Sequence, residues 1–146
     1  LDINYANEIF GFSRIGGVVL TISVGFAIDR FSLKKMMFTQ LLLGGIITVL
    51  IPFAGARYIG WVLFLQATVA MGFFPVGLVA ISRIFAVEQR SLATGIVTTL
   101  GVICGLGFMP YLLGLCGDLF GFSAGIHLLG VCVIISSGLS RLLKLS

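Results

Sequence analysis

Five apolar runs, each about as long as a membrane is thick, dominate this sequence. A helix needs about 20 apolar residues to cross roughly 30 Å of hydrocarbon. Runs of that kind occupy residues 9–28, 36–54, 60–85, 92–115 and 122–139, and charged residues, glycine or proline separate them. A helix satisfies its own backbone hydrogen bonds, which lipid cannot do. The sequence therefore predicts an all-α membrane protein, an antiparallel bundle of five transmembrane helices in one domain.

Composition excludes the main soluble alternatives. Of the 146 residues 59% are hydrophobic and 10% are charged, too few to cover a buried core of this size with polar surface. The net charge is +4, but the basic residues lie between apolar runs and form no solvated face, so we expect no nucleic acid partner. Cys104, Cys116 and Cys132 have no C-x-x-C spacing and the chain has one histidine, so we expect inert thiols and no metal.

The distribution of charge predicts the topology. Short connections between runs make neighbouring helices antiparallel, so successive loops fall on alternate sides of the membrane. One side then carries Arg30, Lys34, Lys35, Arg83, Arg90, Arg141 and Lys144. The other side carries Arg14 and Arg57 with Asp2, Glu8 and Asp118. The positive-inside rule predicts a cytoplasmic C-terminus in an inner or plasma membrane. Because five spans leave Leu1 outside, we expect a further span upstream in a longer protein.

The loop after the first run carries a motif. Residues 25–35 read GFAIDRFSLKK, which resembles the G-x-x-x-D-R-x-G-R-[RK] loop of the major facilitator superfamily. Ser32 and Leu33 stand where the family prefers Gly and Arg, as in its weaker copy of the loop, between the eighth and ninth helices. Further on, charged and small residues resemble the family's tenth to twelfth helices: Arg83, Glu88, Arg90, Ala93, Gly95, Gly114, Gly117, Asp118 and Gly121.

The resemblance implies that the chain is a partial C-terminal domain, about helices eight to twelve of a secondary transporter, or permease. Such a protein moves a small-molecule substrate by rocking two helical bundles around a site near the bilayer midplane. It also implies an N-terminal helical bundle of the same protein as the partner that completes the cavity. The third run departs from the pattern of the N-terminal half, because it has Gln66 and no R-x-x-x-G pair.

The resemblance further implies a charged gate. A carboxylate at the end of a helix opposes the helix dipole, so Asp29 needs a partner such as Arg30 or a neighbouring helix N-terminus. In the family a similar Asp is thought to hold the cytoplasmic ends together in one conformation and release them in the other. The gating candidates are Asp29, Arg30, Lys34, Arg83, Glu88 and Arg90. The alternative is that these charges only set the topology.

Polar residues inside the runs are candidates for the substrate pathway, because burying them in hydrocarbon is costly. Arg14 lies about 7 Å inside the first run by helical rise. Its side chain could extend to the outer interface or contact an anionic substrate, which makes a small organic anion the expected solute. Gln66 could line the pathway or bond to a neighbouring helix, and we expect His127 to be a satisfied interfacial side chain.

Helix-weakening residues mark the third and fourth runs. Pro75 and Pro110 each remove a backbone hydrogen bond and should bend their helices. Both are flexing candidates, with static packing as the alternative. In the first run Ser13, Gly17, Thr21 and Gly25 fall on one face, which should permit a close helix approach.

No catalytic or cofactor motif accompanies these features. There is no carboxylate near the middle of a run to carry a proton, and no phosphate-binding loop, nucleophile elbow or H-E-x-x-H. We therefore expect no cofactor and no enzyme activity. The rival hypotheses are a non-transporting membrane scaffold or assembly subunit and, less favoured, a membrane-embedded enzyme.

Overall fold

The computed structural model describes residues 3–142, which form helices joined by short connections and contain no strand. The elements are α1 (Ile3–Arg30), α2 (Leu33–Leu50), the short 3-10 helix η1 (Ile51–Phe53), α3 (Ile59–Ile84), α4 (Val87–Val102), the π-helical segment η2 (Ile103–Phe108), α5 (Met109–Phe120) and α6 (Phe122–Ser140). Within this part of the chain, five helical units are long and apolar enough to cross a membrane. The predicted all-α architecture of five transmembrane helices is confirmed.

The helices extend past the apolar runs by the largest margins in α1 and in the fourth unit. α1 begins at Ile3, before residue 9, and the fourth unit runs without a break from Val87 to Phe120, beyond the predicted 92–115. Hydropathy missed both extensions because a helix does not need apolar residues outside the hydrocarbon. The 34 residues of the fourth unit give a length of about 51 Å. A helix of that length tilts in the bilayer or projects from it.

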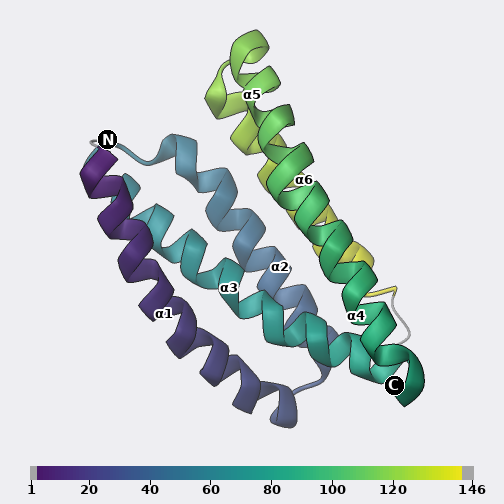
Figure 1. Ribbon diagram of the computed structural model, residues 1–146. Coiled ribbons are helices and arrows are strands. Elements are labelled where there is room, and N and C mark those ends of the chain that lie inside the picture. Colours follow the sequence, from purple (N-terminus) through teal and green to yellow (C-terminus); the bar gives the residue numbers. More distant parts are fainter. Residues whose placement is uncertain (1–2, 143–146) are drawn as a thin grey trace.

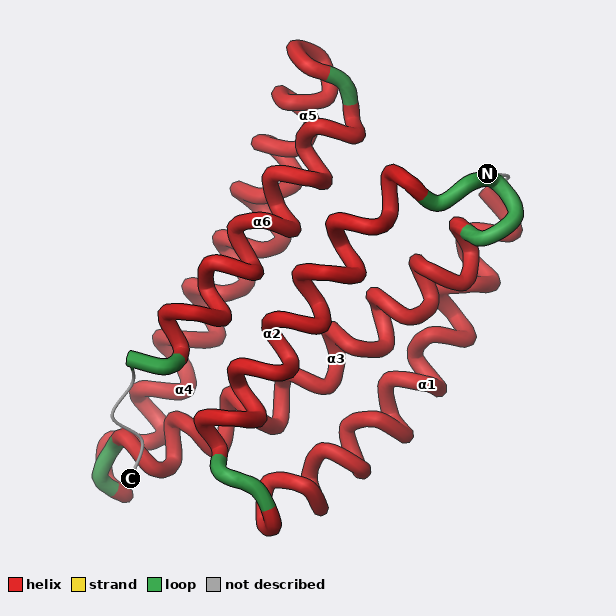
Figure 2. The backbone as a smooth tube through the Cα atoms, turned by 180° about the vertical axis from the view of Figure 1, so that it is seen from behind, coloured by secondary structure: helices red, strands yellow, loops and turns green. Residues whose placement is uncertain are grey.

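The packing order differs from the order along the chain. α1 packs on α3, α3 packs also on α2, α2 packs on α6, and α6 packs on α5 (Figures 1 and 2). α1, α2 and α3 share a core near the connection between α1 and α2. It consists of Val24, Ile28, Leu33, Met37, Val76 and Ala80. This core fixes the position of the loop that carries the Asp29-Arg30 motif.

Glycines set two close helix contacts. A Cβ placed on Gly45 of α2 would lie 3.1 Å from the carbonyl oxygen of Gly130 in α6, and one on Gly130 would lie 2.8 Å from the backbone nitrogen of Val49. On α1, a Cβ at Gly17 would collide with the side chain of Met71. Backbones can come this close only where side chains are absent.

Only part of the predicted small-residue face of α1 packs closely against another helix. Ser13 is 2% exposed and Gly17 is buried against α3. Thr21 lies at the edge of that contact, half-buried. A Cβ at Gly25 would meet nothing within 4 Å, so the close approach ends before this residue.

The connections lie at two ends of the bundle (Figure 2). The loops after α1 and after α3 lie at the same end as the last turn of α6, and the first turn of α1 lies at the other end (Figure 1). This arrangement matches the alternation used to assign the charges to sides, although Lys144 and Asp2 fall outside the described residues. Ser32 begins α2 by accepting a hydrogen bond from the Lys35 amide on its Oγ, at 3.3 Å. Gly121, with φ of 87°, reverses the chain between α5 and α6.

Candidate functional site

Arg14 and Gln66 lie at the same level of the bundle. α1 and α3 are parallel neighbours, since contacts advance together along both helices: Ile9 faces Gly60, and Leu20 faces Gly72. Between these contacts the Thr68 hydroxyl donates a long hydrogen bond, 3.5 Å, to the Ser13 carbonyl. Arg14 follows Ser13 and Gln66 precedes Thr68 by two residues, so the parallel packing brings the two candidates to one depth.

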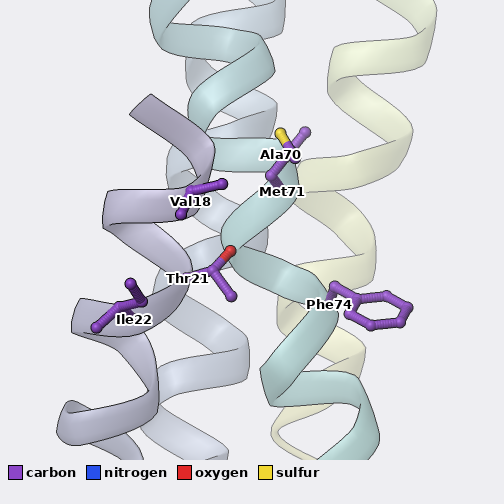
Figure 3. Close-up of a pocket in the computed structure, with 6 residues that line it drawn as sticks. All are labelled: Val18, Thr21, Ile22, Ala70, Met71 and Phe74. Carbon is purple, nitrogen blue, oxygen red and sulfur yellow. The ribbon is translucent and has the colours of Figure 1, made fainter. Parts of the chain in front are cut away.

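A groove runs between these helices immediately inward of both residues. It has a volume of about 620 Å³. Three residues of α1 and three of α3 line it: Val18, Thr21, Ile22, Ala70, Met71 and Phe74 (Figure 3). Its wall is almost wholly apolar apart from the Thr21 hydroxyl. Arg14 lies one turn outward from Val18, and Gln66 one turn outward from Ala70, so both approach the outer end of the groove.

The Arg14 side chain is exposed, and Gln66 is half-buried. Among residues 3–142 no side chain forms an ion pair or hydrogen bond with the Arg14 guanidinium. Its five N–H donors are therefore available to solvent, to a lipid headgroup or to a bound anion. The two pathway candidates thus share one depth, a helical turn outward of the groove; neither lines it, and they do not bond to each other.

The gating candidates gather at the opposite end of the bundle from Arg14. Asp29 and Arg30 end α1 and are exposed, while Lys34 lies in the first turn of α2 and is half-buried. The partner expected for Asp29 was Arg30 or a neighbouring helix N-terminus, and in the described part of the chain Asp29 forms no ion pair with Arg30. Exposure explains this difference, because water solvates the carboxylate and a surface ion pair adds little.

The second charged loop lies at the same end. Arg83 is in the last turn of α3, and Glu88 is in the first turn of α4, where each charge has the favourable sign for the helix dipole. The Arg90 Nε–H donates a 3.2 Å hydrogen bond to the Phe85 carbonyl and so ties α4 to the end of α3. All three side chains are exposed.

Comparison with protein families identifies the family to which the chain belongs. A family model of the Major Facilitator Superfamily matches residues 2–145, nearly the whole chain. The chain belongs to the major facilitator superfamily. None of the curated proteins and none of the solved structures matches it. Membership identifies an integral membrane protein of transporter class, with a small-molecule substrate and a lipid bilayer as its surroundings, and it does not point to an enzyme.

The prolines of this facilitator chain lie in different backbone settings. Pro75 is inside α3, which stays helical through it, although a proline leaves the carbonyl four residues earlier, that of Met71, without its amide partner. Pro110 follows the π-helical segment η2, where the Met109 amide reaches back to the Cys104 carbonyl. The wider turn accommodates the proline ring, and such segments bend helices.

Sequence reasoning missed Gln40. This residue of α2 is 8% exposed. Its amide nitrogen and the Leu20 side chain of α1 both lie where a Cβ on Gly72 of α3 would be. A buried amide in the middle of an apolar run was the available signal, since polar groups in spans are rarely placed without use. Gln40 thus adds a polar group at the point where α1, α2 and α3 of this facilitator meet.

His127 and the three cysteines lie outside the groove and the charged loops. The His127 ring nitrogen Nδ1 is 2.6 Å from the Ser123 carbonyl oxygen, and the ring packs edge-on against Phe53 at 4.8 Å between centroids. The three cysteines are free. No group of three or more His, Cys, Asp or Glu side chains gathers within residues 3–142.

Proposed function

We propose that this chain forms most of the C-terminal bundle of a secondary transporter that moves a small organic anion by alternating access. An N-terminal bundle of the same protein would face it and complete the cavity. The observation that carries the proposal is the Arg14 guanidinium, without a partner among the described residues, beside a groove and level with Gln66.

The chemistry of these two side chains suits a carboxylate or phosphate solute. Guanidinium binds either anion through two parallel N–H donors. The Gln66 amide can donate to the solute or accept from it. The apolar groove below them would hold the carbon skeleton, since solute sites are mostly apolar with a few polar groups that fix orientation.

The gate is proposed at the opposite end. Asp29, Arg83, Glu88 and Arg90 are exposed and make no ion pairs within the described chain. They are therefore free to pair across the interface with the other bundle when this end closes. In that role Asp29 is an acceptor for basic groups of the partner bundle, and opening releases it to water.

Helix bending supplies the movement in this proposal. The π-helical segment η2 and Pro110 lie in the long fourth unit, and Pro75 lies in α3. Both units have weakened backbone hydrogen bonding in the middle of the span, where a change of bend moves the ends most. The alternative is static packing of bent helices, which predicts unchanged transport when either proline is replaced by alanine.

The orientation follows from charge. The loops after α1 and α3 and the end of α6 share one end of the bundle and hold most of the basic residues of the described chain. By the positive-inside rule we propose that this end is cytoplasmic and that the membrane is a plasma or inner membrane.

Uptake into proteoliposomes tests the function. The intact protein that contains this chain would be reconstituted and offered a panel of labelled mono- and dicarboxylates and organic phosphates. We expect saturable uptake of at least one anion, with Arg14→Gln reducing it at least tenfold and Arg14→Lys retaining part of it. Arg57→Gln, which removes an exposed cation stacked near Tyr58 at 5.9 Å, is the matched control and should transport normally. Equal uptake by Arg14→Gln and wild type would remove Arg14 from the pathway.

A further inference from the structure

Three cations converge where the start of α2 meets the end of α6. Lys34 and Lys35 lie in the first turn of α2, and Arg141 directly follows α6. With them, two hydroxyl side chains and one ring line a pocket of about 500 Å³: Ser32, Lys34, Lys35, Phe38, Thr39 and Arg141. We propose that this pocket binds the phosphate headgroup of an anionic phospholipid.

Helix packing builds this pocket from distant parts of the chain. The close contact of Gly45 with Gly130 holds α2 against α6 and brings Arg141 over the first turns of α2. The Arg141 Cζ atom lies 3.8 Å from the centroid of the Phe38 ring. Stacking on a ring holds the guanidinium plane in place while its edge donors stay available to an anion.

The electrostatics favour an anion strongly. No carboxylate lines the pocket, and Lys34, Lys35 and Arg141 have no acidic partner anywhere in residues 3–142. The positive end of the α2 dipole adds to the three charges. The Ser32 and Thr39 hydroxyls supply further donors for phosphate oxygens. Three cations without an acidic partner give this site a positive potential that attracts an anion.

The surface below the pocket fits a lipid better than a free anion. One face of α2 passes from Lys35 and Thr39 to Leu43, Ile46 and Leu50, at spacings of three or four residues. The last three are 45%, 41% and 49% exposed. The cations thus lie at the end of the span, at headgroup level, and an open apolar track continues at the level of the acyl chains. Inorganic phosphate has no apolar part that could contact this surface.

Lipid titration of the intact protein tests the site. The protein in mild detergent would be titrated with phosphatidylglycerol and, separately, with phosphatidylcholine, and bound lipids would be counted by native mass spectrometry. We expect tighter retention of phosphatidylglycerol. Each cation removed should lower the apparent affinity for phosphatidylglycerol about fivefold. The variants are the single substitutions Lys35→Gln and Arg141→Gln and the triple variant that carries both together with Lys34→Gln.

Arg57→Gln is the matched control, since Arg57 is also an exposed cation beside an aromatic ring but lies in the loop at the other end. It should bind phosphatidylglycerol as the wild type does. The single variants Lys35→Gln and Arg141→Gln keep the test decisive if the triple variant does not fold. Equal loss in Arg57→Gln, equal retention of the two lipids, or full competition by millimolar inorganic phosphate would each overturn the lipid site.

Discussion

Replacing Gly130 by alanine tests the close contact between α2 and α6. The new Cβ would lie 2.6 Å from the Val49 Cγ2 atom, 2.8 Å from the Val49 nitrogen and 3.1 Å from the Gly45 carbonyl oxygen. Ordinary carbon contacts are about 3.5–4.0 Å, so the helices must separate by roughly 0.5–1 Å. Two of the three atoms are backbone and cannot rotate away. Overpacking of this kind costs about 1–3 kcal/mol.

Gly138→Ala in the same helix is the matched control, because a Cβ there meets nothing within 4 Å. Alanine is favoured over glycine in a helix by about 1 kcal/mol. That gain applies to both variants, so the difference between them reports the steric term alone. We expect Gly130→Ala to be less stable than Gly138→Ala by about 1–3 kcal/mol in SDS-induced unfolding of the intact protein, followed by circular dichroism. Equal midpoints would show that α2 and α6 do not approach as closely as described.

Three further predictions concern the gate, the flexing points and the turn before α6. Asp29→Asn should lower transport more than it lowers folded protein in the membrane, with Asp29→Glu milder; equal transport by wild type and Asp29→Asn at matched expression would reduce the loop to a topology signal. Pro110→Ala restores an amide donor next to η2, and Pro75→Ala restores one in α3. Both variants should therefore have higher thermal stability and slower transport, with solute binding retained. Unchanged transport in both variants would show that the prolines serve packing only. Gly121→Ala forces a side chain into a backbone with φ of 87° and ψ of 148° and should lower stability by about 1–3 kcal/mol, measured by the same SDS unfolding. No loss would contradict the turn geometry.

The sequence predicted the number of spans and the family, because run length and the motif of residues 25–35 are properties of single segments. It did not predict that α3 lies between α1 and α2, because the small-residue face of α1 indicates a close contact without identifying the partner helix. The depth match of Arg14 with Gln66 was equally hidden, as it follows from the parallel packing of α1 and α3. Gln40 was visible as a polar residue in an apolar run, but only the fold shows that it is buried at Gly72.

The charged loops show a second limit of sequence reasoning. Their placement at one end of the bundle followed from alternation and is reproduced. The helix dipole predicted a partner for Asp29, either Arg30 or a neighbouring helix N-terminus, and the exposed carboxylate makes no ion pair among the described residues. A gate acts by changing its contacts between two conformations. A motif and a helix dipole describe one helix end in one conformation, so they do not predict those contacts.

Access to the groove from both sides of the membrane is the most direct test of the transport mechanism. In the intact protein with Cys104, Cys116 and Cys132 replaced by serine, a single cysteine at Thr21 would be treated with a membrane-impermeant maleimide from either side of sealed vesicles. Alternating access predicts labelling from both sides, with protection by a transported anion, whereas a cysteine at Ile135, 60% exposed on α6, should react from neither. Labelling of the Thr21 position from one side only, or from neither, would contradict the account.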